Sequence, residues 1–302
     1  MDVSIIIVNY NTKDLLKNCL ESIYKQTKEI SFEIIISDNG STDGSIKMIK
    51  DKFPQVTLIE NNANLGFGAA NNKALEIAKG KFIFYLNSDT VLLNNAVKYF
   101  YDYWETSPEK DKIGALGANL LDENMNIIHS YGNFAGYKIA LKQLFKMFFS
   151  NIILSILFIF HISLKKRNSS SIETKFIGEV DYVTGADLFL LNDLNAKFDE
   201  YFFLYFEEAD LQKKLFNQNK KRLIIEGPLI QHFCGGSVGE DFNIKRKASF
   251  SRIQFELSRL KFLKKHFSIK LLPFAKTFIT LIWINPLLFK QTKKYIKDLW
   301  KI

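Results

Sequence analysis

Cysteine is scarce in this chain of 302 residues. The only two cysteines, Cys19 and Cys234, lie far apart, and neither belongs to a Cys-x-x-Cys pair. Their spacing excludes the disulfide framework that small secreted domains use, and it predicts a reducing compartment. The N-terminal stretch MDVSIIIVNYN has an acid at position 2 and no cleavage-like site after its apolar run, so we expect no signal peptide.

The common phosphate-binding loops are also missing. The segment NNANLGFGAANN, residues 61–72, has neither the GxGxxG nor the GxxxxGK[ST] spacing, so it supports neither dinucleotide binding nor P-loop chemistry. Its two glycines beside small alanines still permit a close approach of the backbone to a ligand. No internal repeat is visible, and the length predicts one large domain or two small ones.

Acidic residues are scarce at the C-terminal end. Residues 243–302 hold 15 of the 41 lysines and arginines but only two acids, Glu256 and Asp298, whereas residues 1–242 hold 26 basic and 30 acidic residues. A basic tail predicts an anionic partner. Its lysines alternate with Phe, Leu, Ile and Trp, which favours an anionic membrane surface. No basic nucleic-acid-binding motif is present, so we expect no nucleic-acid partner.

Short β-branched runs alternate with helical patterns in the first part of the chain. The pattern predicts strands over 3–8, 33–37, 56–60 and 81–86, and helices over 14–26, 45–52 and 71–79. This alternation is typical of an α/β fold with a mostly parallel sheet, in which ligands bind at the carboxyl ends of the strands. Three polar clusters fall at such ends: NYNT (9–12), DNGSTD (38–43) and NSD (87–89).

The second half of the chain is less regular. We expect two strand pieces around Gly185 within residues 180–191, an aromatic and then helical segment over 198–218, and a strand over 221–231. His232 ends that strand and precedes a glycine-rich loop that we expect to be flexible. Residues 250–267 place apolar side chains on one helical face.

The NSD cluster offers ligands for a hard divalent cation. Asp89 supplies a carboxylate, and Asn87 could bond a ribose or a metal-bound water. His232, at a strand end, is a candidate further ligand. A plain turn and a structural histidine remain the alternatives, because Asn, Ser and Asp are common turn residues.

Two other acidic clusters invite a functional interpretation. Asp38 ends a predicted strand and could accept a hydrogen bond from a nucleobase; alternatively its loop is a plain connection in which Ser41 or Thr42 caps the next helix. YFEEADL, residues 205–211, places three carboxylates beside aromatic rings, and burial there would raise a carboxyl pKa toward that of a general base. An acidic first turn stabilised by the helix dipole is the alternative.

Taken together and in this order, the motifs resemble the inverting glycosyltransferases of family two, with the GT-A fold, and in particular their rhamnosyltransferase-like branch. The segments that carry the resemblance are VSIIIVNYNTKDLLKNCLESI, EIIISDNGSTDGS, NNANLGFGAANNKALEIAKGKFIFYLNSDTVL, VTGADLFL, FDEYFFLYFEEADLQKKL and the H…GGS loop, within residues 3–240. The resemblance implies a nucleotide-diphosphate sugar donor, dTDP-rhamnose among the candidates, and Mn²⁺ or Mg²⁺. It also implies transfer with inversion to a hydroxyl of a growing bacterial cell-surface glycan or lipid-linked acceptor.

The resemblance further implies a role for individual residues. Nucleotide-sugar binding falls to Asn9, Tyr10, Asn11, Asp38, Asn64, Gly66, Asn87 and Ser88. Acceptor binding falls to Gly185, Ala186 and Glu207, metal binding to Asp89 and His232, and the role of catalytic base to Glu208.

Two positions depart from the family pattern. Asn87 stands where stricter members carry Asp, and Glu208 stands where the usual base is Asp. These departures motivate a different hypothesis, a catalytically inactive membrane-bound homologue that acts as a scaffold. Within the enzyme hypothesis, galactofuranose, glucose or N-acetylglucosamine could replace rhamnose as the transferred sugar.

We expect a GT-A domain over 1–242 with a hydrophobic helical insert at about 137–170, followed by a basic amphipathic helical tail over 243–302. The run 147–164 is 18 mostly apolar residues flanked by lysines, at the lower limit of a membrane span. If this run crossed the membrane once, Asp89 would lie on one side and Glu208 and His232 on the other, although they are predicted to form one active site. We therefore expect an interfacial or re-entrant segment first, a buried helix pair second and a true span third. The expected location is the cytoplasmic face of the membrane, as a peripheral or monotopic protein.

Overall fold

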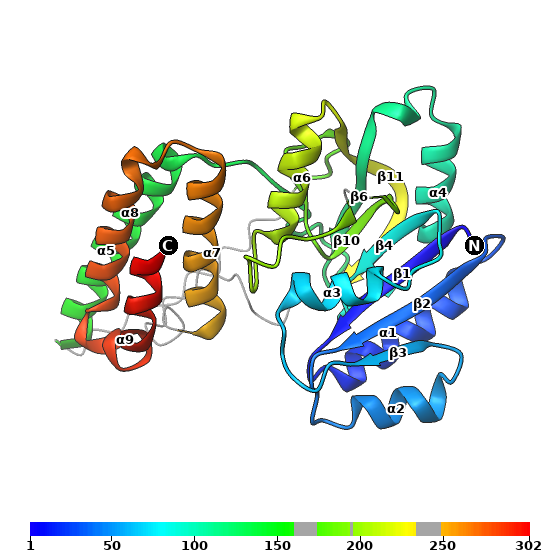
Figure 1. Cartoon of the computed structure of the whole chain (residues 1–302), viewed down its shortest axis with the longest axis horizontal. Coiled ribbons are helices and arrows are strands. Elements are labelled where there is room, and N and C mark those ends of the chain that lie inside the picture. Colours follow the sequence, from blue (N-terminus) through cyan, green and yellow to red (C-terminus); the bar gives the residue numbers. More distant parts are fainter. Residues whose placement is uncertain (160–173, 194–195, 234–248) are drawn as a thin grey trace. The chain divides into compact units, whose positions relative to one another are not determined.

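The computed structural model describes residues 1–159, 174–193, 196–233 and 249–302. Two compact units make up the chain (Figure 1). We call the first, Met1–Phe134, Ile172–Phe203 and Glu207–Cys234, the α/β unit. The second, Ala135–Ser171, Leu204–Phe206 and Gly235–Ile302, is the helical unit. Each is described separately below. Cys234 and the predicted flexible loop after Phe233 lie outside the described residues.

The α/β unit is built on one mixed sheet in the order β3-β2-β1-β4-β10-β6-β11-β5, with β8 paired to β11. Its strands are β1 (Val3–Asn9), β2 (Phe32–Asp38), β3 (Thr57–Glu60), β4 (Phe82–Leu86), β5 (Thr90–Leu92), β6 (Ile113–Leu121), β8 (Gly178–Glu179), β10 (Asp187–Leu191) and β11 (Lys221–His232). β7 (Tyr131–Gly132) and β9 (Tyr182–Val183) form a separate pair. Strands β1 to β4 are parallel to one another, and β11 is parallel to β6, whereas β10 runs antiparallel between β4 and β6. The predicted α/β class with a mostly parallel N-terminal sheet is confirmed.

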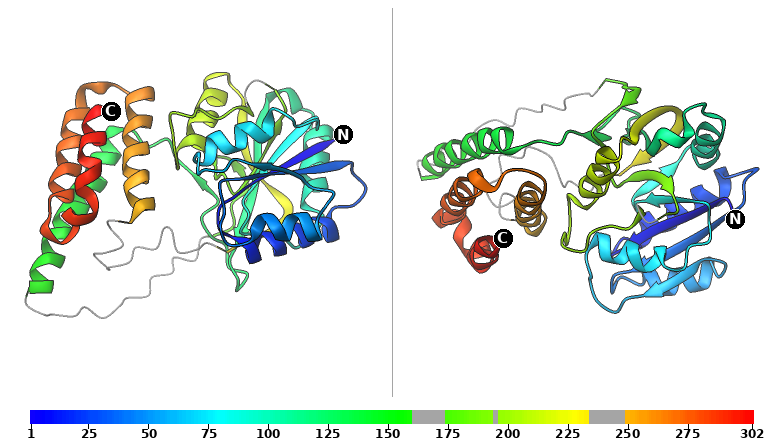
Figure 2. Two further views of the ribbon diagram at one scale, coloured as in Figure 1. Left: turned by 60° about the horizontal axis from the view of Figure 1, so that its bottom comes forward. Right: turned by 45° about the horizontal axis from the view of Figure 1, so that its top comes forward.

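Helices cover both faces of this sheet (Figure 2). Alternate strand residues point to opposite faces. Accordingly Ile5 and Ile7 pack with α1 (Lys13–Gln26), α2 (Ser45–Lys52) and α4 (Ala96–Thr106), whereas Ile6 packs with α3 (Phe67–Leu75) and α6 (Glu207–Asn217). β1 is buried on both faces, which explains why it has no polar alternation in sequence.

The predicted helix over 71–79 is displaced in the structure. α3 begins at Phe67, directly after Gly66, and ends at Leu75. The Phe67 N–H donates to the Phe203 carbonyl, 2.9 Å away, so a contact distant in sequence sets the start of the helix. The other helices and strands predicted in the first 90 residues lie within one residue of the expected bounds.

The helical unit holds α5 (Tyr137–Ile159), α7 (Phe250–His266), η4 (Ile269–Leu271), α8 (Leu272–Trp283) and α9 (Pro286–Lys301). Leu144 of α5, Leu260 of α7 and Ile279 of α8 belong to one apolar core. The first part of the hydrophobic insert, residues 137–148, therefore packs with the C-terminal helices, and residues 160–170 of the predicted insert lie outside the described residues. Among the residues that the structure describes, no helix combines the length and apolar character that crossing a membrane would require.

Candidate active site

The carboxyl ends of β1 and β2 place Asn9 beside Asp38. Asn9 Nδ2 donates to Asp38 Oδ2 at 2.7 Å and to Ser41 Oγ at 2.9 Å. Asp38 Oδ1 accepts from the backbone N–H groups of Gly40 and Ser41. Both Asn9 and Asp38 are fully buried. Asp38 therefore organises the loop that follows β2, and its contact with a nucleobase stays a prediction.

Asn11 joins the two loops. Its backbone has φ +55°, its Oδ1 accepts from the Thr42 N–H at 2.8 Å, and its own N–H donates to Ser41 Oγ at 2.9 Å. The alternative that Ser41 or Thr42 caps the next helix is wrong, because α2 begins at Ser45 with Gly44 in the capping position. The hydroxyl of Ser41 instead joins β1 to β2. Tyr10 lies beside Asn11 and leaves half of its side chain exposed.

The loop between β3 and α3 is tied to the end of β2 through amide side chains. Asn39 Nδ2 donates to the Gly66 carbonyl at 3.0 Å, and Asn64 Oδ1 accepts from the Gly66 N–H at 3.0 Å. Gly66 has φ +89° and ψ 175°, a conformation that is open essentially to glycine alone. Asn64 and Gly66 thus lie next to the Asp38 loop, and their contact with the nucleotide stays a prediction. Sequence reasoning placed Asn39 in a tight turn and did not name it as a site residue, although it lies in the same polar cluster.

The NSD turn and the end of β11 meet at the same edge. β11 is antiparallel to β5, and His232 pairs with Thr90 in register. His232 Nε2 lies 3.2 Å from Asp89 Oδ1 and 3.4 Å from Asn87 Nδ2. The Phe233 N–H also donates to the Asp89 carbonyl at 2.8 Å. Residues 145 positions apart in sequence therefore form one cluster.

The donors of this cluster suit a divalent cation, and their spacing agrees. In an octahedral site with bonds of about 2.1 Å, neighbouring donor atoms lie about 3 Å apart. The 3.2 Å between Asp89 Oδ1 and His232 Nε2 is compatible with this value, and it is equally the distance of a direct hydrogen bond or ion pair; both side chains are partly exposed. Within the described part of the chain, no three or more His, Cys, Asp or Glu side chains lie close enough together to coordinate one metal ion.

Ser88 connects the NSD turn to the first loop. Its Oγ lies 2.9 Å from Thr12 Oγ1, and the Thr12 hydroxyl donates to Asn9 Oδ1 at 2.6 Å. The chain Ser88–Thr12–Asn9–Asp38 therefore runs along the carboxyl edge from β4 to β2. Thr12 was not among the predicted site residues; its place in the NYNT cluster was the available signal.

Glu208 lies beside the predicted acceptor segment. A Cβ added to Gly185 would meet a ring atom of Phe67 at 3.4 Å and the Glu208 Cβ at 3.8 Å. Glu208 is partly exposed, whereas the neighbouring Glu207 is only 3% exposed. The Ala186 carbonyl accepts from the Asn87 N–H at 3.0 Å, which ties this segment to the NSD turn. Glu208 is thus the carboxylate of the pair that solvent reaches.

The three residues before α6 belong to the helical unit. Tyr205 and Phe206 both have a positive φ, 69° and 68°. Phe206 packs on Phe255 of α7 with ring centroids 5.2 Å apart, and Ser258 Oγ donates to the Leu204 carbonyl at 2.8 Å. A left-handed backbone conformation is unfavourable for bulky residues. The contacts with α7 offset this cost and keep the turn directly before Glu207 in its strained conformation.

Asp187 is a buried carboxyl that sequence reasoning did not single out. It begins β10, directly after Ala186, and is fully buried. Burial raises its pKa well above the usual range; the Ala118 N–H, which donates to Oδ2 at 2.7 Å, and the charge of His232 partly offset this. The signal available in the sequence was an acid at the start of the apolar strand DLFLL.

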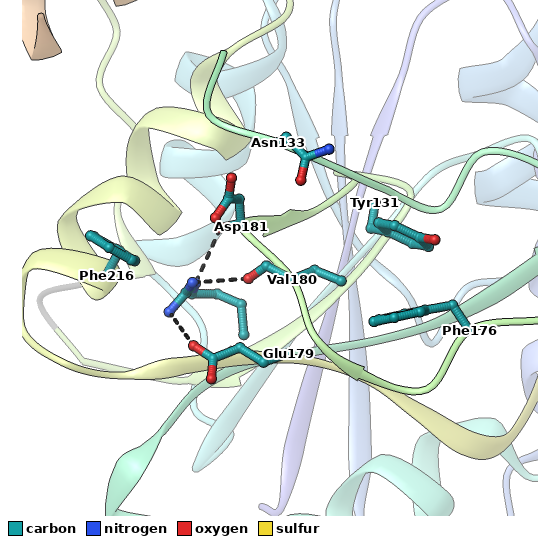
Figure 3. A pocket seen from close by; sticks show the side chains of 8 residues that line it. Tyr131, Asn133, Phe176, Glu179, Val180, Asp181 and Phe216 are labelled. Atoms are coloured by element: carbon teal, nitrogen blue, oxygen red, sulfur yellow. Dashed lines mark hydrogen bonds and ion pairs between the residues drawn. The ribbon is translucent and has the colours of Figure 1, made fainter. Parts of the chain in front are cut away.

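A hollow of about 430 Å³ lies on the α/β unit beside the C-terminal end of α6 (Figure 3). Arg222 is buried under it and donates to the carbonyls of Val180 and Asp181 at 2.9 and 3.1 Å. Its guanidinium also lies 3.3 Å from Glu179 Oε1. Burial lowers the pKa of Arg222, and the nearby carboxylates oppose this shift. Arg222 therefore fixes the backbone of the segment that leads to Gly185. None of the predicted site residues lines the hollow.

Comparison with known proteins agrees with this geometry. Residues 4–130 match the family model described as glycosyl transferase family 2. A poly(ribitol-phosphate) beta-glucosyltransferase of Bacillus spizizenii is 37% identical over 122 residues, which are 38% of this chain and 19% of that protein. A UDP-Glc:alpha-D-GlcNAc-diphosphoundecaprenol beta-1,3-glucosyltransferase of Escherichia coli is 37% identical over 133 residues, 44% of this chain and 45% of that protein. The chain thus spans less than half the length of these two relatives.

Solved structures agree on the fold. A mannosyltransferase from Pyrobaculum calidifontis, in complex with GDP-Man and Mn²⁺, superposes with a TM-score of 0.56 over 98% of this chain and 75% of that one, at 14% sequence identity. A Staphylococcus aureus protein named TarS superposes with a TM-score of 0.52 over 97% and 55% of the two chains, also at 14% identity. Residues 4–130 are therefore similar to glycosyl transferase family 2, and the α/β unit has the GT-A fold of these solved structures.

Proposed function

We propose that the protein transfers a sugar from a nucleotide-diphosphate donor to an acceptor hydroxyl, with inversion at the anomeric carbon. One observation carries the proposal: the Asp89–His232 pair, the Asn9–Asp38 loops and Glu208 all lie along the carboxyl edge of one sheet. Ligands of open α/β sheets bind at this edge. The similarity of residues 4–130 to the glycosyl transferase family 2 model supports the same chemistry.

The nucleotide would lie over the loops that follow β1, β2 and β3. Asn9 and Asp38 brace these loops, Asn11 and Tyr10 offer the exposed surface, and Gly66 allows the chain to approach the ligand closely. Asn64 would support the same side, since its carboxamide holds the Gly66 N–H.

Asp89 and His232 would hold Mn²⁺ or Mg²⁺. Bound there, the cation would offset the negative charge of the leaving diphosphate. Two protein donors leave coordination positions for diphosphate oxygens, as in other sites that bind a cation together with a phosphate ligand. Asn87, whose Nδ2 lies 3.4 Å from the imidazole, would orient His232 or form a hydrogen bond with the donor ribose. Ser88 would stabilise the turn through its hydroxyl contact with Thr12.

Glu208 would act as the general base. It would remove the proton from the acceptor hydroxyl, whose oxygen then attacks the anomeric carbon on the face opposite the diphosphate. Gly185 lacks a side chain and so leaves room for an acceptor beside Glu208. Ala186 and Glu207 would shape the same pocket, and the burial of Glu207 favours a structural part in it.

The relatives indicate which donor to test first. Both reported relatives are named as glucosyltransferases that make β-linkages, and one of them is named for UDP-glucose. A β-product from an α-linked nucleotide sugar requires inversion, which agrees with a single displacement. We therefore place UDP-glucose ahead of dTDP-rhamnose, with a glycan or a lipid-diphosphate-linked sugar as the acceptor.

The helical unit would bring the protein to the cytoplasmic face of a membrane. Its described residues carry 15 lysines and arginines against two acids. They also carry large exposed apolar side chains, among them Ile139, Phe149, Ile153 and Phe274. Positive charge together with exposed apolar surface is typical of proteins that bind an anionic membrane surface. A peripheral location would give access to a lipid-linked acceptor.

Replacing Glu208 by Gln tests the catalytic role. The carboxamide keeps the shape but cannot accept the proton, so we expect sugar transfer to fall about 10²- to 10⁴-fold while nucleotide binding is unchanged. Transfer is measured with UDP-glucose and Mn²⁺, and binding by calorimetry with UDP. Glu21→Gln, an exposed carboxylate on α1, is the matched control. Full transfer activity in Glu208→Gln would exclude Glu208 as the base.

Replacing Asp89 by Ala tests the metal site. We expect UDP binding to lose most of its dependence on Mn²⁺, because the carboxylate donor is removed. The measurement is the UDP dissociation constant with and without Mn²⁺, and Asp51→Ala on exposed α2 is the control. An unchanged Mn²⁺ dependence would remove Asp89 from the metal site.

The inactive scaffold is the alternative, motivated by Asn87 and Glu208 at positions where the family pattern has Asp. Mn²⁺-dependent turnover or hydrolysis of any nucleotide sugar by the wild-type chain would exclude it. If no donor in a panel is turned over or stabilises the protein to heat, the scaffold becomes the better hypothesis.

A further inference from the structure

The helical unit contains a groove that has no part in the candidate active site. Its volume is about 590 Å³, within the range of about 300–1,000 Å³ usual for small-molecule pockets. The groove lies where the start of α5 meets the connection between α7 and α8. Its lining consists of Gly136, Tyr137, Lys138, Ile139, Phe267, Ser268, Lys270 and Leu271.

The lining combines apolar walls with positive charge. Ile139, Phe267 and Leu271 supply the apolar surface, whereas Lys138 and Lys270 are exposed lysines. Neither lysine forms an ion pair within the part of the chain that the structure describes, and no acid lines the groove. Their charge is therefore available to an anion.

The described acids of the helical unit do not compensate this charge. Among its described residues the only acids are Glu256 and Asp298. Glu256 is buried between Arg252 and Arg259, and Asp298 lies 3.0 Å from Lys301. Among the described residues the lining of the groove thus carries an excess of positive charge, which favours an anionic ligand over a neutral one.

Tyr137 provides an independent observation. It lines the groove, is only 5% exposed, and its hydroxyl has no hydrogen-bond partner among the described residues. Buried hydroxyls are normally hydrogen-bonded. Burial raises the pKa of Tyr137, so the hydroxyl keeps its proton at neutral pH. Solvent does not reach this hydroxyl, so an oxygen of a ligand meets it only after a small movement of the groove lining.

We propose that this groove binds the phosphate of an anionic membrane phospholipid. Lys138 and Lys270 pair with the phosphate oxygens, and the Tyr137 hydroxyl donates to the ligand. The first acyl carbons lie along Ile139, Phe267 and Leu271. Exposed Ile269 and Ile139, at 62% and 52%, enter the lipid surface around the groove. The site goes beyond sugar transfer and specifies how the helical unit recognises the membrane.

The experiment measures binding of the full chain to vesicles by flotation. Vesicles of phosphatidylcholine with 30% phosphatidylglycerol are compared with vesicles of phosphatidylcholine alone. Lys138→Gln/Lys270→Gln removes two charges at the groove, and Lys293→Gln/Lys297→Gln removes two exposed charges on α9 as the matched control. Each lysine near an anionic surface contributes about 1 kcal/mol, or about fivefold in affinity. We expect the groove pair to lose at least fivefold more affinity than the control pair.

Tyr137→Phe tests the site without a change of charge. We expect it to weaken binding to the phosphatidylglycerol vesicles two- to fivefold and to leave binding to phosphatidylcholine vesicles unchanged. Equal losses in the two lysine pairs would overturn the proposal in favour of a general positive surface. Release of the protein from vesicles by 10 mM inorganic phosphate, at constant ionic strength, would instead identify a free-phosphate site. Neither measurement depends on glycosyltransferase activity, so the groove proposal and the proposed sugar transfer are tested independently of each other.

Discussion

Gly66 adopts a backbone conformation that an L-residue with a side chain reaches only at a cost, with φ +89° and ψ 175°. A Cβ placed there would lie 2.3 Å from the Phe203 carbonyl oxygen, so the backbone would have to move by about 0.7 Å to reach a tolerable contact. Such a movement would break the 2.9 Å hydrogen bond from the Phe67 N–H to the same oxygen. We therefore expect Gly66→Ala to destabilise the α/β unit.

The magnitude follows from two contributions. The backbone conformation costs about 1–3 kcal/mol for a residue other than glycine, and the lost hydrogen bond leaves a buried polar group at about 1–3 kcal/mol. Together we expect roughly 2–6 kcal/mol, or a fall of about 4–24 °C in the unfolding temperature. Nucleotide binding should also weaken, because Gly66 holds the loop through Asn39 and Asn64.

Gly44→Ala is the matched control. Gly44 has nearly the same φ, +88°, but its ψ of 11° lies in the ordinary left-handed region, and a Cβ would meet nothing closer than the Lys13 side chain at 3.8 Å. This change should cost only about 1–2 kcal/mol. Thermal unfolding and UDP calorimetry on both variants give the comparison. If Gly66→Ala is no less stable than Gly44→Ala and binds UDP equally well, the reasoning from the Phe203 contact is wrong.

Two further changes test buried features around the site. The raised pKa of Asp187 means that the folded protein binds this proton more tightly than the unfolded chain, so stability is lost as pH rises from about 3.8 through the folded pKa. In Asp187→Asn the side-chain oxygen can still accept from the Ala118 N–H, but the side chain no longer titrates. The free energy of unfolding of the variant, measured with urea, should therefore increase relative to wild type as pH rises above 4. A difference that does not change with pH would contradict this. Phe255→Ala removes the ring on which Phe206 packs and should lower the unfolding temperature of the helical unit, measured by circular dichroism; an unchanged temperature would show that this packing does not stabilise the unit.

Much of the candidate site could be predicted because its residues lie in clusters at strand ends. The NYNT, DNGSTD and NSD clusters do lie at the carboxyl ends of β1, β2 and β4, as periodicity alone predicted. The contact between Asp89 and His232 could not be derived this way, since it depends on β11 pairing antiparallel with β5. The start of α3 was predicted four residues late, because the contact that sets it comes from Phe203.

The sequence by itself determined the α/β class, the buried strands and the uneven charge, because these depend on local periodicity and composition. Only the tertiary structure decided that the hydrophobic insert shares a core with the C-terminal helices, so that α5, α7 and α8 form one helical unit. It also decided that Asp187 is buried and that Tyr137 lines a basic groove. Burial and pairing between distant segments depend on which apolar faces meet, and a local pattern shows that a face is apolar without showing its partner.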